Sequence, residues 1–218
     1  MVSCRPFFRQ IKNMSEAASR DDFPQHLPRL ILASTSSYRR ELLTRLQVPF
    51  EVAAPNVDES ALPDEAPAAT AQRLAYDKAC AVGADFPNAL VIGSDQVAYN
   101  ADGRFGKPGT RANAAAQLRA MSGRSIFFHT GLCLLNTTTG KFQLRGIEVE
   151  VGFRTLGESD IQRYLDREDA LNCAGSAKSE GLGVALMTYL RGDDPNALIG
   201  LPLIALCEML RVEGIPLP

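Results

Sequence analysis

Histidine is scarce in this sequence, and its cysteines stand apart from one another. Two histidines in 218 residues, His26 and His129, are too few for a histidine-based metal cluster. The odd number of cysteines and the absence of a C-x-x-C pair argue against a zinc site and indicate a reducing compartment. The cysteines, most of them in apolar runs, are Cys4, Cys80, Cys133, Cys173 and Cys207. We therefore expect a cytoplasmic protein without zinc.

Long apolar runs, a strong net charge and the common nucleotide fingerprints are also missing. No run approaches the roughly 20 residues that cross a bilayer, so we expect no membrane partner. A net charge of −2 argues against binding to nucleic acid polymers but allows a local basic site for phosphates. Neither G-x-G-x-x-G nor G-x-S-x-G occurs, and Pro108 after Lys107 breaks the Walker A pattern. Dinucleotide binding and serine hydrolase activity are therefore disfavoured.

The length and composition are those of one globular domain with a polar N-terminal extension. Hydrophobic residues make up 45% of the 218 residues and charged residues 22%. The polar stretch that precedes the first apolar run predicts a disordered extension over residues 1–28, and translation could start at Met1 or at Met14. We expect the folded domain to span residues 29–215.

The most informative stretch is Leu90–Gln96, sequence LVIGSDQ. Its apolar first half predicts a buried strand, too short for a helix, that stops at Ser94 and Asp95. Ligands of α/β proteins bind outside the carboxyl ends of strands, so Asp95 would stand at the mouth of a site. The alternative is that Ser94 or Asp95 merely caps a turn.

A second strand-to-helix junction carries hydroxyl groups and arginines. The apolar run 30–33 is followed by the hydroxyl residues 34–37, which include Ser34, and then by a helix over 38–46 that starts with Arg39 and Arg40. Backbone N–H groups and the helix dipole favour an anion at such an N-terminus, so this junction predicts phosphate binding. The alternative is a capped surface helix whose arginines are solvated.

Further candidates are carboxylates and lysines near predicted element ends. The pair Asp58-Glu59 follows a predicted strand over 50–54 and offers oxygen ligands for Mg²⁺, although exposed acidic loops are common. Lys78 lies near the edge of a predicted helix over 68–84, where it is a solvated residue unless that helix borders the cleft. Lys107, held by the proline that follows it, offers a point charge for phosphate.

The remaining pattern predicts a mixed α/β sheet flanked by helices. Strands are expected over 126–135 and 142–153 as an antiparallel pair, and helices over 110–121, 158–167 and from Pro202 onward. A glycine-rich loop over 172–183 would let the backbone approach a ligand closely.

Together these stretches resemble the Maf family of nucleotide pyrophosphatases. The motifs that carry the resemblance, in order from residue 29 to about residue 213, are Leu32-Ala33-Ser34, Arg39-Arg40-Glu41-Leu42-Leu43, Val57-Asp58-Glu59, Lys78-Ala79, Ile92-Gly93-Ser94-Asp95-Gln96, Gly106-Lys107-Pro108, Ser122-Gly123-Arg124, His129-Thr130-Gly131, Ala174-Gly175-Ser176 and Gly200-Leu201-Pro202-Leu203. The resemblance implies two lobes around a nucleotide-binding cleft, as in inosine triphosphatase-like folds, and in many cases a homodimer.

The resemblance also implies an activity, the hydrolysis of a nucleoside triphosphate to its monophosphate and pyrophosphate. It makes Asp95 the proton acceptor, with Mg²⁺ or Mn²⁺ on Asp95 and Glu59. Substrate binding would fall to Ser34, Arg39, Arg40, Lys78 and Lys107.

Within the family, this sequence is similar to the subgroup that acts on 7-methyl-GTP and so removes a modified nucleotide. Tyr38, Gln96 and Glu180 carry that similarity and are the expected specificity residues. Two departures, Ser37 for proline and Ala177 for phenylalanine, bear on the turn and the base pocket. The alternatives are the dTTP/UTP specificity of the same family and a non-catalytic, nucleotide-binding regulator of cell division.

Overall fold

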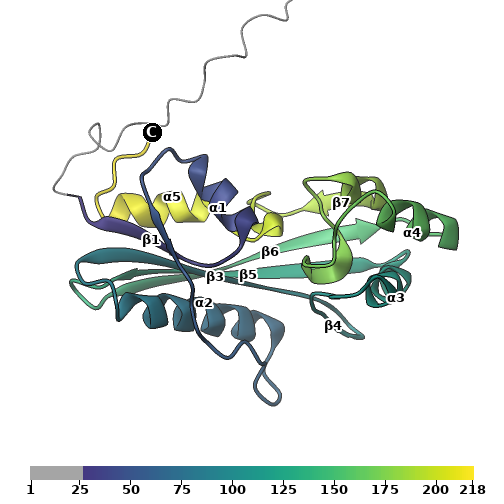
Figure 1. The fold of residues 1–218 in the computed structure, drawn as a ribbon, viewed down its shortest axis with the longest axis horizontal. Helices are drawn as coiled ribbons and strands as arrows, with labels where there is room; N and C mark the ends of the chain where they lie inside the picture. Colours follow the sequence, from purple (N-terminus) through teal and green to yellow (C-terminus); the bar gives the residue numbers. More distant parts are fainter. Residues whose placement is uncertain (1–26) are drawn as a thin grey trace, which may run out of the picture.

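A computed structural model describes residues 27–218, which form one mixed sheet with helices on both faces (Figure 1). The sheet has seven strands in the order β2-β1-β3-β5-β6-β7, with β4 added beside β3. β1 is parallel to β2 and to β3, whereas all the other pairs are antiparallel. The strands are β1 Arg29–Ala33, β2 Glu51–Ala53, β3 Ala89–Asn100, β4 Gly103–Phe105, β5 Ser125–Asn136, β6 Phe142–Phe153 and β7 Met187–Arg191. The expected mixed α/β class and the expected antiparallel pair β5–β6 are confirmed.

Helices cover the two faces of the sheet unequally. α1 and α5 lie on one face, and the long helix α2 lies on the other (Figure 1). The helices are α1 Ser37–Thr44, α2 Pro67–Gly83, α3 Arg111–Met121, α4 Glu158–Leu165 and α5 Leu203–Val212, and short 3₁₀ turns are η2 Ala174–Ser176, η3 Leu182–Leu186 and η4 Ala197–Ile199. Thr110 caps α3 by accepting a hydrogen bond of 3.2 Å from the Asn113 N–H, as the sequence predicts.

The close approach of α2 to the sheet depends on two glycines in neighbouring strands. A Cβ on Gly93 would lie 2.0 Å from the Ala75 carbonyl oxygen, and one on Gly131 would lie 2.2 Å from the Ala71 carbonyl oxygen. These glycines let the helix backbone rest directly on the strands. Because the backbone of α2 lies so close to the sheet, side chains of α2 beside this contact can reach the middle of β3.

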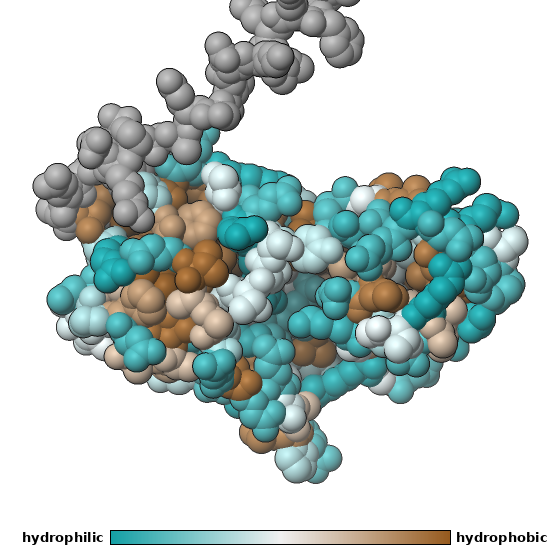
Figure 2. Space-filling view, viewed as in Figure 1, coloured by the Kyte–Doolittle hydropathy of each residue, from teal (hydrophilic) through white to brown (hydrophobic). Residues whose placement is uncertain are grey.

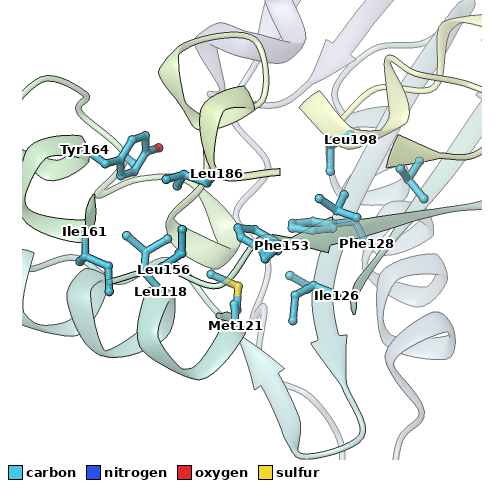
Figure 3. Packing of buried hydrophobic residues seen from close by; sticks show 14 of the residues in the cluster. Leu118, Met121, Ile126, Phe128, Phe153, Leu156, Ile161, Tyr164, Leu186 and Leu198 are labelled. Carbon is cyan, nitrogen blue, oxygen red and sulfur yellow. The ribbon is translucent and has the colours of Figure 1, made fainter. Parts of the chain in front are cut away.

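Buried apolar side chains gather toward the two ends of the long strands. At one end, β5, β6, α3 and α4 enclose a cluster that includes Leu118, Phe128, Phe153 and Ile161 (Figure 3). At the other end, leucines of β1, β3, α1 and α5 form a second cluster on the α1 side of the sheet, and a third lies under α2. Polar residues occupy the region of β3 between these clusters, and this is where the candidate site is found.

The structure corrects the predicted end of the strand that carries Asp95. β3 does not stop at Ser94 and Asp95 but continues to Asn100, because β5 pairs with it from Leu90 to Tyr99. The parallel neighbour β1 stops opposite Gly93, and β4 begins to pair only at Ala98. A gap in one edge of the sheet therefore lies beside residues 94–97, and Asp95 stands at the end of the parallel part of the sheet rather than at the end of its own strand.

The described part of the chain begins shortly before β1, and its four cysteines form no disulfide. Most of the extension expected over residues 1–28 lies outside the described residues, and Leu27 packs against the cluster shared by β1 and α5. Cys80, Cys133, Cys173 and Cys207 are free thiols. None of the helices in the described part of the chain has the length and apolar character required to span a membrane.

Candidate active site

The gap beside β3 opens into a cleft of about 700 Å³. Its floor is Asp95, Gln96 and Val97, and its walls come from the β1–α1 turn, α2, β4 with the loop after it, and the segments around η2 and η4. The space-filling view shows a hollow with a hydrophilic lining between the half that carries α1 and the half that carries α4 (Figure 2). Nine of the ten expected site residues, all except Arg40, come from six different segments of sequence and still meet here. The nine that line the cleft are Ser34, Tyr38, Arg39, Glu59, Lys78, Asp95, Gln96, Lys107 and Glu180.

At the floor of the cleft, one buried lysine joins two carboxylates. The Lys78 Nζ lies 2.6 Å from Asp95 Oδ1 and 2.6 Å from Glu59 Oε1. Lys78 is 3% exposed and Asp95 8% exposed, whereas about half of the Glu59 side chain is exposed. Lys78 is thus not a solvated helix residue, because α2 borders the cleft. Burial works to raise the pKa of Glu59, but the hydrogen bond and charge of Lys78 outweigh it, so the pKa is lowered.

Arg39 is fixed beside these carboxylates by the β1–α1 turn and by η4. Its Nε donates to the Gly200 carbonyl at 2.8 Å, and its Nη1 donates to Ser34 Oγ at 3.4 Å. Ser36 caps α1 by accepting from the Arg39 N–H, as expected for an N-terminal serine. Burial lowers the pKa of Arg39, and Asp95 and Glu59 oppose this shift. Arg39 therefore remains a cation that is held in a preset direction.

The structure does not bring Arg40 to the cleft. Arg40 is exposed on α1 and is not among the residues that line the cavity. Consecutive residues on a helix point about 100° apart, and the side of α1 that carries Arg40 is turned away from the cavity that Tyr38 and Arg39 line. The two arginines are therefore placed differently, and substrate binding by Arg40 stays a prediction that this cavity does not support.

Lys107 faces the cleft from a loop that neighbouring elements hold in place. The Gly106 carbonyl accepts hydrogen bonds from the Gln117 side chain at 3.1 Å and from the Gly175 N–H at 3.4 Å. The Pro108 carbonyl accepts one from Asn113 Nδ2 at 3.0 Å. The lysine itself is exposed, so a fixed backbone presents a solvated ammonium group to the cavity.

Tyr38, next to Arg39 in α1, lines the cleft where it lies against the glycine-rich loop. The Cys173 thiol donates to the Tyr38 hydroxyl at 3.7 Å, and the Lys178 Nζ lies 5.6 Å from the centre of the Tyr38 ring. Lys178 is in turn bound by Glu168 at 3.1 Å. Burial, with help from Cys173, raises the pKa of Tyr38 to about 12, so its hydroxyl stays neutral at physiological pH. Glu180 is exposed and lines this part of the cleft.

The Gln96 amide has a structural partner that sequence reasoning did not find. Its Nε2 donates to the carbonyls of Ala197 at 2.8 Å and Leu198 at 3.0 Å, and it lies 3.0 Å from Thr130 Oγ1. These acceptors fix which way the amide points. Gln96 and Asp95 are neighbours in a strand and so face opposite sides of the sheet, Gln96 toward η4 and Asp95 toward α2.

Other residues of the cleft were not expected from the sequence. Arg104 and Thr70 face each other across one end, and Cys173 and Gly200 contact expected site residues. Arg104 belongs to a three-residue strand in a polar turn region, which gives no signal of a site by itself. Its part in the cleft follows from the pairing of β4 with β3.

The donor set at the cleft floor suits a hard divalent cation. Glu59 and Asp95 supply carboxylate oxygens, which Mg²⁺ and Mn²⁺ prefer, and both converge on one positive group. Within residues 27–218, no three His, Cys, Asp or Glu side chains form a metal-binding group. A metal at this position would thus take its other ligands from water and substrate phosphates, which is common for Mg²⁺.

Comparison with known proteins identifies the family of this chain. A family model described as Maf-like protein matches residues 29–213. The chain is 55% identical over 190 residues to the 7-methyl-GTP pyrophosphatase of Aromatoleum aromaticum, covering 87% of this chain and 98% of the relative. It is 57% identical over 193 residues to the protein of the same name from Burkholderia pseudomallei, covering 87% and 90% of the two chains. The protein of that name from Nitrosococcus oceani is 55% identical over 189 residues, or 87% of this chain and 95% of the relative. This chain therefore belongs to the Maf-like protein family.

Proposed function

We propose that this protein hydrolyses 7-methyl-GTP to 7-methyl-GMP and pyrophosphate. The observation that carries the proposal is the cluster of Asp95, Lys78 and Glu59 in a cleft that Tyr38 and Glu180 also line. Relatives 54–57% identical to the chain bear the name 7-methyl-GTP pyrophosphatase, which supports this choice of substrate.

In the proposed reaction, water attacks the α-phosphorus, the bond from that phosphorus to the bridging oxygen breaks, and pyrophosphate leaves. Asp95 accepts the proton of the attacking water, a role open to a carboxylate that reaches the substrate. Lys78 fixes the direction of the Asp95 carboxylate through its 2.6 Å contact. Arg39 and Lys107 offset the charge that develops on the phosphate oxygens.

A divalent cation, Mg²⁺ or Mn²⁺, is part of this proposal. Glu59 and Asp95 would hold it, and it would supply charge neutralisation for the phosphates and polarise the reacting group. Because Lys78 already bridges the two carboxylates, the same ammonium group would remain beside the phosphates and add to that neutralisation.

Specificity for the methylated base would reside on the α1 side of the cleft. A 7-methylguanine ring is cationic, and the neutral Tyr38 ring offers it an electron-rich face, worth about 1–2 kcal/mol when desolvated. The Glu180 carboxylate can accept from the N–H groups of the Watson–Crick edge. Gln96, whose nitrogen is engaged by η4, would orient the base with its carbonyl oxygen.

A pyrophosphate-release assay tests the function. Purified protein is given 7-methyl-GTP, GTP, dTTP or UTP with Mg²⁺ or Mn²⁺, alongside Asp95→Asn and the exposed control Asp85→Asn. We expect the fastest turnover with 7-methyl-GTP. Asp95→Asn should lose activity, whereas the control Asp85→Asn should keep the activity of wild type. Preference for dTTP or UTP would instead support the other specificity in the family. No turnover of any nucleotide would support a non-catalytic regulator of cell division.

Cellular location and assembly are also part of the proposal. A cytoplasmic enzyme follows from the odd number of scattered cysteines without a C-x-x-C pair and from its nucleotide substrate. A homodimer follows from the resemblance to the family, and the mass of the purified protein in solution tests it.

A further inference from the structure

Arg104 is a cation of the cleft that the function above leaves unused. In β4 it pairs with Tyr99 of β3, so both side chains lie on the same side of the sheet as Asp95 and α2. Its Nη1 donates to Thr70 Oγ1 at 3.0 Å, and its Nη2 donates to the Glu65 carbonyl oxygen. Arg104 and Thr70 both line the cleft. The arginine thus spans one end of the cavity from β4 to α2.

No carboxylate neutralises Arg104 within the part of the chain that the structure describes. The carboxylate of Glu65, whose backbone carbonyl accepts from Arg104, is bound in bidentate fashion by Arg73 at 2.7 and 2.8 Å. That ion pair lowers the pKa of Glu65 to about 2, so this carboxylate is already committed. Arg104 has two neutral acceptors and five N–H donors, which leaves donors and a full positive charge for an anion.

The two faces of β3 determine where a nucleotide's terminal phosphates would lie. Residues assigned to the base, Tyr38 and Gln96, are on the face that carries α1 and η4. Asp95 and Lys78 are on the α2 face. A nucleotide whose base occupies the first face and whose α-phosphate reaches Asp95 directs its remaining phosphates along α2. Arg104 stands on that side.

We propose that Arg104 binds the two terminal phosphates of the substrate, and therefore the pyrophosphate product. The inference deepens the proposed function and rests on it. Arg104 would act as a binding and positioning residue for the leaving group, presenting a planar pair of N–H donors to phosphate oxygens. Lys107, three residues later in the same segment, would add a second cation from the loop after β4.

The experiment measures binding of pyrophosphate and of 7-methyl-GMP separately, by calorimetry with Mg²⁺ present. The proteins are wild type, Arg104→Gln, Arg104→Lys and the control Arg124→Gln. Arg124 is an exposed arginine that binds Asp102 in the β3–β4 turn, so its loss perturbs the same hairpin outside the cleft. We expect Arg104→Gln to weaken pyrophosphate binding about tenfold or more, which matches the loss of a charged hydrogen bond. Binding of 7-methyl-GMP should stay within about twofold of wild type, with Arg104→Lys intermediate.

Kinetics on the same variants separate this inference from the proposed function. Arg104→Gln should raise the KM for 7-methyl-GTP and weaken inhibition by pyrophosphate, while inhibition by 7-methyl-GMP is unchanged. Unchanged pyrophosphate affinity in Arg104→Gln, or no pyrophosphate binding by wild type, overturns the role of Arg104. Equal losses for both products also overturn it, because Arg104 would then only hold β4 on α2. A wild-type protein that binds pyrophosphate through Arg104 but does not hydrolyse 7-methyl-GTP overturns the proposed function alone.

Discussion

Replacing Lys78 by methionine tests the charge cluster on which the proposed site depends. Methionine keeps an unbranched apolar stem of similar length inside α2 but removes the ammonium group. Asp95, which is 8% exposed, then loses its ion pair, while Glu59 is about half exposed and regains water. The variant therefore isolates one buried carboxylate in an otherwise intact cleft.

The size of the effect follows from the burial of the two partners. Removing one member of a buried ion pair costs about 3–5 kcal/mol, because the other charge is left uncompensated. Since Glu59 is solvated and only Asp95 stays buried, we expect the lower value, about 3 kcal/mol. For a domain of this size each kcal/mol lowers the melting temperature by about 2–4 °C, so the expected fall is about 6–12 °C. Hydrolysis should be lost as well.

Urea and thermal unfolding of five proteins measure this prediction: wild type, Lys78→Met, Asp95→Asn, the double variant of these two, and Lys141→Met. Lys141→Met, at an exposed lysine, controls for the substitution itself. The double variant Lys78→Met/Asp95→Asn removes the stranded charge, so it should recover much of the lost free energy of unfolding while remaining inactive. A fall below about 1 kcal/mol in Lys78→Met, or a double variant as unstable as the sum of the single ones, would refute the reasoning.

Four other expectations follow from the structure. Gly131→Ala should destabilise the fold by about 3 kcal/mol or more in urea unfolding, because its Cβ would lie 2.2 Å from a carbonyl oxygen of α2. Glu180→Gln and Tyr38→Arg should each lower the ratio of kcat/KM for 7-methyl-GTP over that for UTP, and an unchanged ratio would place the base elsewhere. The pKa of Glu65 is lowered from 4.5 to about 2 by its arginine partner on α2, so its ionised carboxylate stabilises the fold above about pH 4.5 and this contribution is lost as the pH falls toward 2. In Glu65→Gln the free energy of unfolding should therefore fall less steeply with pH over this range. Deleting residues 1–26, which precede both β1 and the family match, should leave the activity and melting temperature nearly unchanged.

The sequence by itself determined the elements that depend on local chemistry. Alternating and apolar runs predicted the strands β5 and β6 to within one residue at most of their ends. Thr110 and Gly123 marked the limits of α3, because a hydroxyl caps an N-terminus and glycine adopts a positive φ, here 70°, at low cost. The hydroxyl-rich turn before Arg39 favours an anion site from local features alone, and that site stays a prediction.

Tertiary structure decided what depends on partners distant in the sequence. Periodicity left Lys78 at the edge of a helix, and only the packing of α2 on Gly93 and Gly131 brings its ammonium group to Asp95. The strand of Asp95 extends past its predicted end because β5, which begins 30 residues after Asp95 in the chain, supplies hydrogen-bonding partners.

The cleft itself is a tertiary feature. It exists because β1 stops opposite Gly93 whereas β4 starts only opposite Ala98, and no local pattern records where two strands end relative to a third. The same pairing carries Arg104 to the cavity, and the rotation of the helix turns Arg40 away from it. Residue type and spacing thus indicated the chemistry, while strand register and helix packing determined which side chains meet.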